Sequence, residues 1–262
     1  MSSFFPNDEF IKKIGDDMIQ SSILFPTGIG PHDFEPTINQ IQTVDSANVV
    51  VYYGLGIENW ITNINNAHKI DASEDLNASH SDRGNMTLDP QVWLNPSLAK
   101  KEVENIRDGW MTNDPNNRYR YFNNAKNLLN ELDNLDKTII TYSESCKKRD
   151  FITFHNSFSY FAKQHGLNHN ISNAGPVAEV TPRRLAEIIN IAKSLDLKVI
   201  YSEDLMDSRY ASVFAQEISD NKFLVLSPIG GLTKYDQEVG IEYIDKMNEN
   251  IKNLTVGLEY NQ

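Results

Sequence analysis

The chain contains a single cysteine, Cys146, among its 262 residues. This excludes an intrachain disulfide and a metal site built from several cysteine thiolates. Hydrophobic runs are short, and none approaches the ~18 consecutive apolar residues that a membrane-spanning helix requires. Positive charge is also scarce, because 24 Lys and Arg stand against 36 Asp and Glu and leave a formal net charge of −12. This excess of negative charge argues against nucleic acid or an anionic membrane surface as a partner.

The start of the chain lacks the features of a signal peptide. The segment Met1-Ser2-Ser3-Phe4-Phe5-Pro6 has no basic region and no long apolar core. An α/β fold would also need a strand before the first expected helix, and hardly any sequence precedes that helix. Two alternatives follow: a cytoplasmic protein, or an exported protein whose signal segment and first strand are missing from this chain.

Short apolar runs alternate with amphipathic segments along the sequence, which is typical of an α/β fold with mainly parallel sheets. The runs predict strands at residues 18–25, 48–53, 151–154, 198–201 and 223–226. The periodic segments predict helices at residues 8–17, 37–44, 57–64, 97–110, 116–142, 157–165, 182–195, 208–219 and 235–258. The polar segment 68–86 predicts an exposed loop.

One predicted helix is much longer than the others. Its apolar residues recur in steps of four and three, at Tyr121, Ala125, Leu128, Leu132, Leu135, Ile139 and Tyr142. At 1.5 Å per residue such a helix spans roughly 40 Å, long enough to cross two lobes. We therefore expect an N-terminal α/β lobe at residues 1–113, a spanning helix at 114–147 and a C-terminal α/β lobe at 148–262.

The segment Gly28-Ile29-Gly30-Pro31-His32-Asp33-Phe34-Glu35-Pro36-Thr37 cannot form regular structure, because two prolines and two glycines interrupt it. It predicts a shaped loop that leads into a helix at Pro36 and Thr37. A His held in such a loop is suited to bind a metal ion. The alternative is a turn in which His32 only hydrogen-bonds its neighbours.

Four segments lie at strand ends or in proline-framed loops, and they contain His32, Gln91, His155 and Ser227. Two fall in each half of the chain. Ligands of open α/β sheets bind beyond the carboxyl ends of the strands. We therefore expect these residues to build a site between the two lobes.

Several motifs resemble those of a known family in the same order along the chain. They are Gly28 to Thr37, the segment Val51 to Glu58 followed by Trp60, Asp89 to Pro96, His155 to Phe161 with His165-Gly166-Leu167, Glu203, Arg209 and the turn Ser227 to Gly230. Together they resemble the metal-specific solute-binding proteins of ABC importers, the cluster A-I zinc and manganese receptors, nearly from end to end.

The resemblance implies two Rossmann-like lobes, a rigid spanning helix and a metal ion bound between the lobes. It implies a monomeric receptor outside the cytoplasmic membrane that delivers its ion to an ABC permease. Since such a receptor is exported, we expect that a signal segment and the first strand are missing from this chain. His32 and His155 match two metal ligands of the family. Gln91 stands where the family usually has His, and Ser227 where it usually has Asp or another acid. Two imidazoles favour Zn²⁺ over Mn²⁺ as the cargo.

The residues Gln91 and Ser227 leave a buried divalent ion without a carboxylate to balance its charge. Three alternatives are open: another acid joins the site, water completes a weak site, or the fold has lost metal binding. Candidate acids are Glu203, Glu179, Asp33 and Glu35.

The leading hypothesis for function is a transport receptor. A metal-free binding or adhesion protein is an alternative, and a metal-dependent hydrolase is a weaker one. The sequence shows no acid–base pair or nucleophile motif beside the His residues, so we expect no enzymatic activity.

Overall fold

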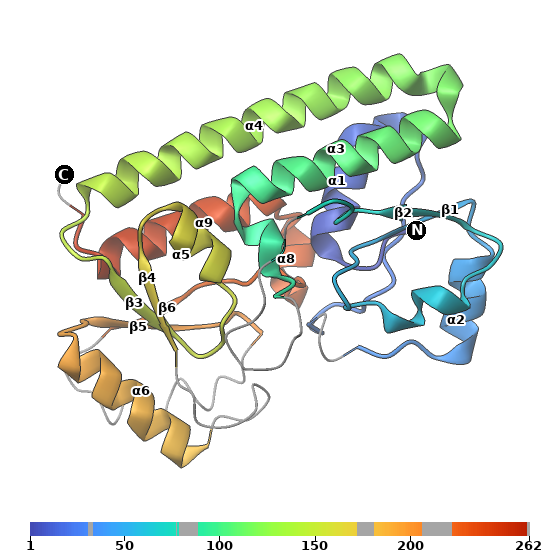
Figure 1. The fold of residues 1–262 in the computed structure, drawn as a ribbon. Helices are drawn as coiled ribbons and strands as arrows, with labels where there is room; N and C mark the ends of the chain where they lie inside the picture. Colours follow the sequence, from blue (N-terminus) through green and yellow to red (C-terminus); the bar gives the residue numbers. More distant parts are fainter. Residues whose placement is uncertain (31–33, 77, 79–88, 172–180, 206–221, 261–262) are drawn as a thin grey trace. The chain divides into compact units, whose positions relative to one another are not determined.

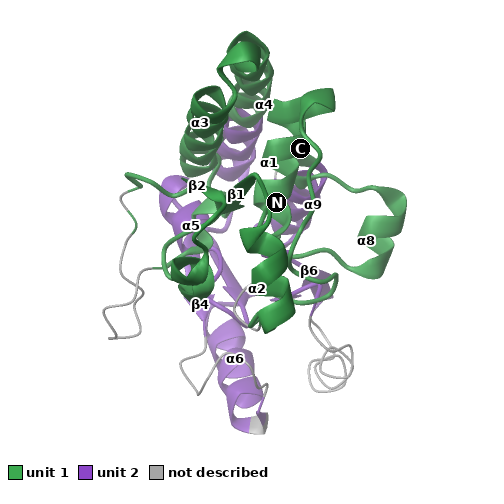
Figure 2. Cartoon of the chain, turned by 90° about the vertical axis from the view of Figure 1, so that its right-hand side faces the viewer, with its two compact units in different colours: residues 1–134, 229–244 green, residues 135–228, 245–262 purple. Residues whose placement is uncertain are grey.

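The computed structural model describes residues 1–30, 34–76, 78, 89–171, 181–205 and 222–260 (Figure 1). These residues form two compact units, unit 1 with residues 1–134 and 229–244 and unit 2 with residues 135–228 and 245–262 (Figure 2). Each unit contains helices and parallel strands, so the predicted α/β class is confirmed. The predicted lobe boundaries stay a prediction.

Unit 1 contains a two-stranded parallel sheet. Its strands are β1 (Val49–Tyr52) and β2 (His68–Asp71). The run of β-branched residues in β1 is buried, as predicted for a strand covered on both faces. The helices are α1 (Phe5–Gly15), α2 (Ile38–Asp45), α3 (Pro96–Asn113), α8 (Lys234–Val239) and the 3-10 helices η1 (Asp16–Met18), η2 (Asn59–Asn63), η3 (Gln91–Leu94) and η4 (Pro115–Asn117).

Three aromatic rings form the centre of the unit 1 core. Phe4, Tyr53 and Trp93 pack edge to face, with ring centroids between 4.9 and 5.1 Å apart. All three are buried, and this geometry is favourable because the positive edge of one ring meets the negative face of the next. The cluster joins the start of α1, the end of β1 and the segment that carries Gln91.

Two predictions for unit 1 were wrong. Residues 18–25 form no strand, and only a single parallel bridge joins Ile23 to Ser2, which also bridges to Val51. The predicted loop 68–86 begins instead with strand β2, whose one buried residue, Ile70, packs under α3 at Gly109. Backbone pairing with β1 makes this strand, because its side chains give no hydrophobic run.

Unit 2 contains a four-stranded, all-parallel sheet in the order β4-β3-β5-β6. The strands are β3 (Asp150–Thr153), β4 (Asn168–Ile171), β5 (Val199–Ser202) and β6 (Lys222–Val225). The sequence did not predict β4, because its residues Asn-His-Asn-Ile are mostly polar. The helices of this unit are α5 (Ser159–Gln164), α6 (Pro182–Ser194) and most of α9 (Tyr243–Gly257).

Helices cover both faces of the unit 2 sheet (Figure 1). Side chains alternate between the faces along a strand. Ile152 and Ile200 therefore pack against Ile188 of α6 in one buried cluster. On the other face the hydroxyl of Tyr201 donates to the carbonyl of Asn253 in α9. With both faces covered, the loops at the strand ends are the places left for a polar site.

Helix α4 (Arg118–Ser145) is the long helix that the sequence predicted, and its residues belong partly to unit 1 and partly to unit 2. Its predicted stripe is buried at six positions: Tyr121, Ala125, Leu128, Leu132, Leu135 and Ile139. Tyr142, the last member, is partly buried.

The predicted helix 235–258 is interrupted, so that prediction was wrong in part. Gly240 takes a left-handed conformation, with φ of +69°, and ends α8. The amide of Ile241 then donates to the carbonyl of Asp236, which closes the helix end. A new helix, α9, starts at Tyr243.

Other segments differ from prediction in extent. The segment 57–64 contains only the 3-10 helix η2, and α5 is shorter than the predicted helix 157–165. The predicted helix 208–219 lies outside the described residues.

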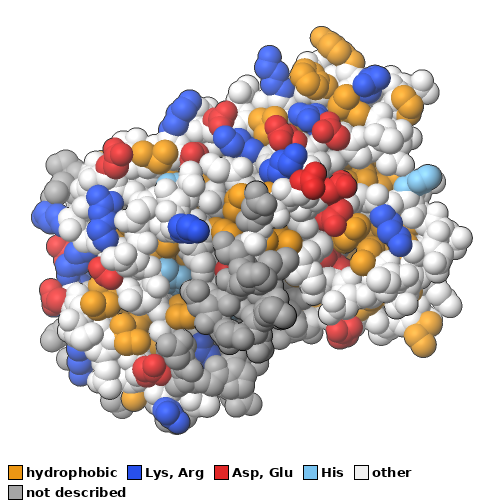
Figure 3. Space-filling view, in the orientation of Figure 1, with side chains coloured by type: hydrophobic (Ala, Val, Ile, Leu, Met, Phe, Trp, Pro, Cys, Tyr) orange, Lys and Arg blue, Asp and Glu red, His pale blue; other side chains and the backbone are white. Residues whose placement is uncertain are grey.

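The face drawn in Figure 3 carries hydrophobic as well as charged side chains. Figure 3 shows acidic and basic side chains interspersed over the visible face. Among the helices that the structure describes, none is both long and apolar enough to cross a membrane.

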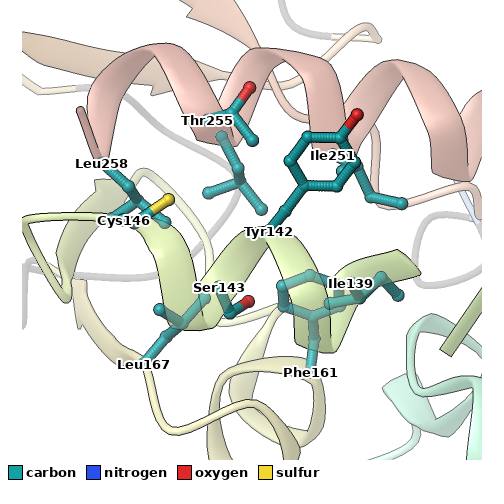
Figure 4. A pocket seen from close by; sticks show the side chains of 10 residues that line it. Ile139, Tyr142, Ser143, Cys146, Phe161, Leu167, Ile251, Thr255 and Leu258 are labelled. Carbon is teal, nitrogen blue, oxygen red and sulfur yellow. The ribbon is translucent and has the colours of Figure 1, made fainter. Parts of the chain in front are cut away.

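A small apolar cavity lies inside unit 2 (Figure 4). Ile139, Cys146 and Leu258 are among the residues that line it, and its volume is about 10 Å³. A cavity needs roughly 10–15 Å³ to hold even one water molecule. This cavity is therefore at most the size of one water molecule and is too small for a ligand.

Candidate functional site

His155 lies just beyond the carboxyl end of β3, as predicted. The backbone there is held from three sides. The carbonyl of His155 accepts from the Thr153 hydroxyl at 2.6 Å and from the Ser157 amide at 2.9 Å. The buried guanidinium of Arg184, from α6, donates to the carbonyl of Phe154. These contacts fix the turn that presents the His155 ring.

The His155 imidazole contacts two side chains through the same nitrogen. Nδ1 lies 2.7 Å from Oγ of Ser157 and 3.3 Å from Oε1 of Glu203. Glu203 follows strand β5, the neighbour of β3 in the parallel sheet. The carboxyl ends of parallel strands share one edge of a sheet, and this brings residues 48 positions apart together at the site.

A second histidine, His169 on β4, supports the turn from beneath. Its Nε2 lies 2.6 Å from the Thr153 hydroxyl, which also contacts the His155 carbonyl. A carbonyl can only accept and a hydroxyl has one hydrogen, so the Thr153 hydroxyl donates to the carbonyl. It must then accept from His169, whose proton is on Nε2.

His169 is neutral in this environment. Burial, and to a lesser extent the nearby His155, lower the pKa of His169 to about 3. Its ring stacks on Phe151, with centroids 4.8 Å apart. His169 therefore acts as a hydrogen-bond donor that supports the His155 turn. This role could not be predicted from the sequence, because the residues of β4 are mostly polar and show no strand pattern.

Ser227 follows strand β6 and is buried. Its hydroxyl donates to Oδ2 of Asp204 at 2.5 Å, and its amide donates to Oδ1 of Asn250 at 2.7 Å. Lys246, from α9, donates to the same Asp204 oxygen at 2.9 Å. The Lys246 and Asp204 side chains are only 4% and 9% exposed. The predicted ligand Ser227 thus belongs to a buried ion pair that the sequence did not reveal.

Gln91 belongs to unit 1 and begins the 3-10 helix η3. Its side chain is buried, and its backbone N–H donates to Oδ1 of Asp89 at 3.0 Å. Asn95 closes the same segment by capping α3, since its side-chain oxygen accepts from the amides of Ser97 and Leu98. The proline-framed segment is therefore a rigid buried turn that holds Gln91 in place.

His32 lies outside the described residues. The described residues on either side of it make defined contacts. The amide of Gly28 donates to the carbonyl of Leu232, and Thr37 caps α2 in a reciprocal pair with Gln40. The predicted helix start at Thr37 is confirmed.

Across the described residues, no group of three or more His, Cys, Asp or Glu side chains converges on a point where a metal ion could bind. The structure brings His155 together with Glu203, and Ser227 together with Asp204. The predicted ligand set of His32, Gln91, His155 and Ser227 stays a prediction.

The contacts of His155 differ from those of a hydrolytic triad. In such a triad the serine and the acid contact opposite nitrogens of the imidazole, so that a proton can pass through the ring. Here Ser157 and Glu203 both contact Nδ1. The arrangement orients the ring and gives no relay from the hydroxyl to the carboxylate.

Comparison with known proteins places these features in context. The sequence matches, over residues 1–257, the family model described as ZnuA, zinc-uptake complex component A, periplasmic. It is 34% identical over 270 residues to the high-affinity zinc uptake system protein ZnuA of Bacillus subtilis, covering 96% of this chain and 84% of that protein.

Solved structures of metal-binding proteins are also similar to this chain. The Zn(II)-bound structure of AdcA from Streptococcus pneumoniae matches with a TM-score of 0.88 and 28% identity, covering 99% of this chain and 57% of that one. The laminin-binding protein Lmb of Streptococcus agalactiae, described as an adhesin with metal-transporting activity, matches with a TM-score of 0.86 and 26% identity, covering 98% of each chain. The chain thus spans little more than half the length of AdcA.

Proposed function

Because the chain belongs to the ZnuA family of periplasmic zinc-uptake components, we propose that it is a receptor that binds a divalent metal ion as cargo. Zn²⁺ is the cargo we favour over Mn²⁺, since imidazole donors suit zinc. The match to the family over residues 1–257 is the observation that carries this proposal. The receptor works outside the cytoplasmic membrane and delivers the ion to the permease of an ABC importer.

His155 is the proposed ligand with the strongest structural support. It lies at the carboxyl end of a parallel strand, and its ring is oriented through Nδ1. This leaves Nε2 as the nitrogen that would bind the cargo. We propose His32 as the second imidazole ligand, with Gln91 and Ser227 as weaker oxygen donors. The Ser227 hydroxyl can donate its hydrogen bond to Asp204 and still bind a cation, because its oxygen has two lone pairs.

In the proposed function, the protein binds and releases the ion and catalyses no reaction. The contacts of Ser157 and Glu203 with a single His155 nitrogen support this part of the proposal, because they provide no path for proton transfer. The likeness to Lmb keeps an adhesive role as the second candidate. Metal binding separates the receptor from a metal-free adhesin.

The proposal is tested by titrating the chelator-stripped protein with Zn²⁺ in competition with a chromophoric chelator. We expect one ion per chain and a rise in melting temperature. A ligand at 100 times its dissociation constant stabilises a protein by about 2.7 kcal/mol. A protein that takes up no zinc and whose melting temperature does not change would contradict the receptor and favour the metal-free alternative.

The substitution Gln91→His is expected to tighten zinc binding. An imidazole is a stronger neutral donor for zinc than an amide oxygen. We expect the dissociation constant to fall at least about tenfold, equivalent to about 1.4 kcal/mol. Gln42→His adds a histidine at an exposed position of α2 and serves as the control. Equal affinities of the wild type and Gln91→His would show that residue 91 does not contact the ion.

A further inference from the structure

The proposed ligands are all neutral: two imidazoles, one amide and one hydroxyl. A divalent ion that leaves water needs negative charge nearby, because burying uncompensated charge is costly. If the chain binds zinc as proposed above, the compensating charge must come from a residue outside that ligand set.

Two carboxylates follow strand β5 at the site edge, and their surroundings differ. The charge of Asp204 is balanced by Lys246 at 2.9 Å, and the same oxygen accepts from Ser227. Within the described part of the chain, Glu203 has no Lys or Arg within ion-pair distance. Among the residues that the structure describes, the charge of Asp204 is therefore balanced by a lysine, whereas that of Glu203 is not.

The carboxylate of Glu203 is also directed at His155. Its Oε1 is buried and lies 3.3 Å from Nδ1 of His155, and no hydrogen bond of ordinary geometry to a described residue satisfies it. A buried carboxylate oxygen without a hydrogen bond is costly. The cost is recovered if the oxygen accepts a proton-bearing nitrogen.

We propose that Glu203 is the positioning residue of the zinc site. It accepts from Nδ1–H of His155, which fixes the proton on Nδ1 and directs the lone pair of Nε2 toward the cargo. It also places one negative charge behind the imidazole that binds the ion. This inference rests on the proposed zinc-receptor function. Carboxylates that orient a metal-binding histidine in this way typically change metal affinity by 10–100-fold.

Ser157 provides the competing arrangement. Its hydroxyl lies 2.7 Å from the same nitrogen and could donate to Nδ1, which would place the proton on Nε2. In that tautomer the proton would block the nitrogen that faces the ion. The position of the proton on His155 therefore distinguishes the two arrangements without any metal present.

The test compares the wild type with Glu203→Gln, Glu203→Asp and the control Glu249→Gln, which removes an exposed carboxylate from α9 of the same unit. Zinc affinity is measured by chelator competition, and the His155 tautomer by nitrogen-15 NMR of the metal-free protein. We expect Glu203→Gln to weaken zinc binding by about 10–100-fold, Glu203→Asp to restore part of it, and Glu249→Gln to leave it unchanged. The wild type should carry the proton on Nδ1.

The outcomes separate the two proposals. A wild type that binds no zinc contradicts the receptor function, and the tautomer of the metal-free wild type still tests the role of Glu203. A wild type that binds zinc, with Glu203→Gln binding equally well, overturns the role of Glu203 and leaves the receptor intact. A proton on Nε2 of His155 in the wild type also overturns it. If Glu203→Gln does not fold, Glu203→Asp and the wild-type tautomer decide the matter.

Discussion

Replacing His155 by alanine is expected to abolish measurable one-to-one zinc binding. His155 is the imidazole ligand proposed from unit 2, and the other ligand proposed from this unit, Ser227, offers only a hydroxyl oxygen. We expect the dissociation constant to rise at least about 100-fold, equivalent to about 2.7 kcal/mol. The measurement is chelator competition, together with the shift in melting temperature that zinc produces.

The fold should survive this substitution, because the His155 turn is held mainly through the backbone. Thr153, Ser157 and Arg184 contact main-chain atoms of residues 154 and 155, and alanine keeps those atoms. His68→Ala, which removes an exposed histidine from β2, is the matched control and should bind zinc as the wild type does. Zinc affinity that is lost in His68→Ala and retained in His155→Ala would move the site to the polar segment 68–86.

The sequence predicted those elements whose own residues determine them. Helix α4 was predicted because its apolar stripe repeats over seven positions, and six of them are buried. Strand β1 was predicted from a continuous β-branched run. Strands β2 and β4 were missed because each is short and polar, and each exists only through pairing with a neighbouring strand. The break at Gly240 was missed because the apolar period continues across it.

The site residues also differ in whether their positions could be predicted from the local sequence. The position of His155 after a strand could be predicted, since carboxyl ends of parallel strands carry ligands. The pairing of Ser227 with Asp204 could not, because Lys246 holds Asp204 from a helix 42 residues further along the chain. The contact between Glu203 and His155 depends on which strands are neighbours in the sheet. Strand order is a property of the whole fold and leaves no local signal.

The substitution Glu102→Gln is expected to stabilise the protein at alkaline pH and to weaken the pH dependence of its stability. Glu102 lies on α3 and is completely buried. The Tyr53 hydroxyl donates to Oε1 at 2.7 Å, and Oε2 has no partner among the described residues. Burial raises the pKa of Glu102 to about 8 from its ordinary value of 4.5, although the Tyr53 hydrogen bond lowers it.

The direction of the pH effect follows from this raised pKa. The folded protein keeps the Glu102 proton to a higher pH than the unfolded chain does, so protonation stabilises the fold. That contribution is fully present below about pH 4.5 and is lost as the pH rises toward about 8. Each pH unit in that window removes about 1.4 kcal/mol, so the total loss over about 3.5 units is on the order of 5 kcal/mol.

A second buried acid acts in the same direction and sets the limit of the effect. Burial raises the pKa of Glu58 to about 7, although the amides of Tyr53 and Gly54 donate to its two oxygens. The Glu102→Gln variant retains Glu58, so its stability should still fall with rising pH, but less steeply than that of the wild type. The measurement is urea unfolding of both proteins in steps between pH 4.5 and pH 8.5.

We expect the two unfolding free energies to agree at the acid end, because a protonated glutamate and a glutamine have nearly the same shape and charge. At the alkaline end they should differ by several kcal/mol, which is the stability that the wild type loses when Glu102 is deprotonated. Glu104→Gln removes a less buried carboxylate from the same helix and controls for the change in net charge. If Glu102→Gln were destabilising by the same amount at every pH, the carboxylate would be ionised in the folded protein, and the Tyr53 hydrogen bond would outweigh the cost of burial.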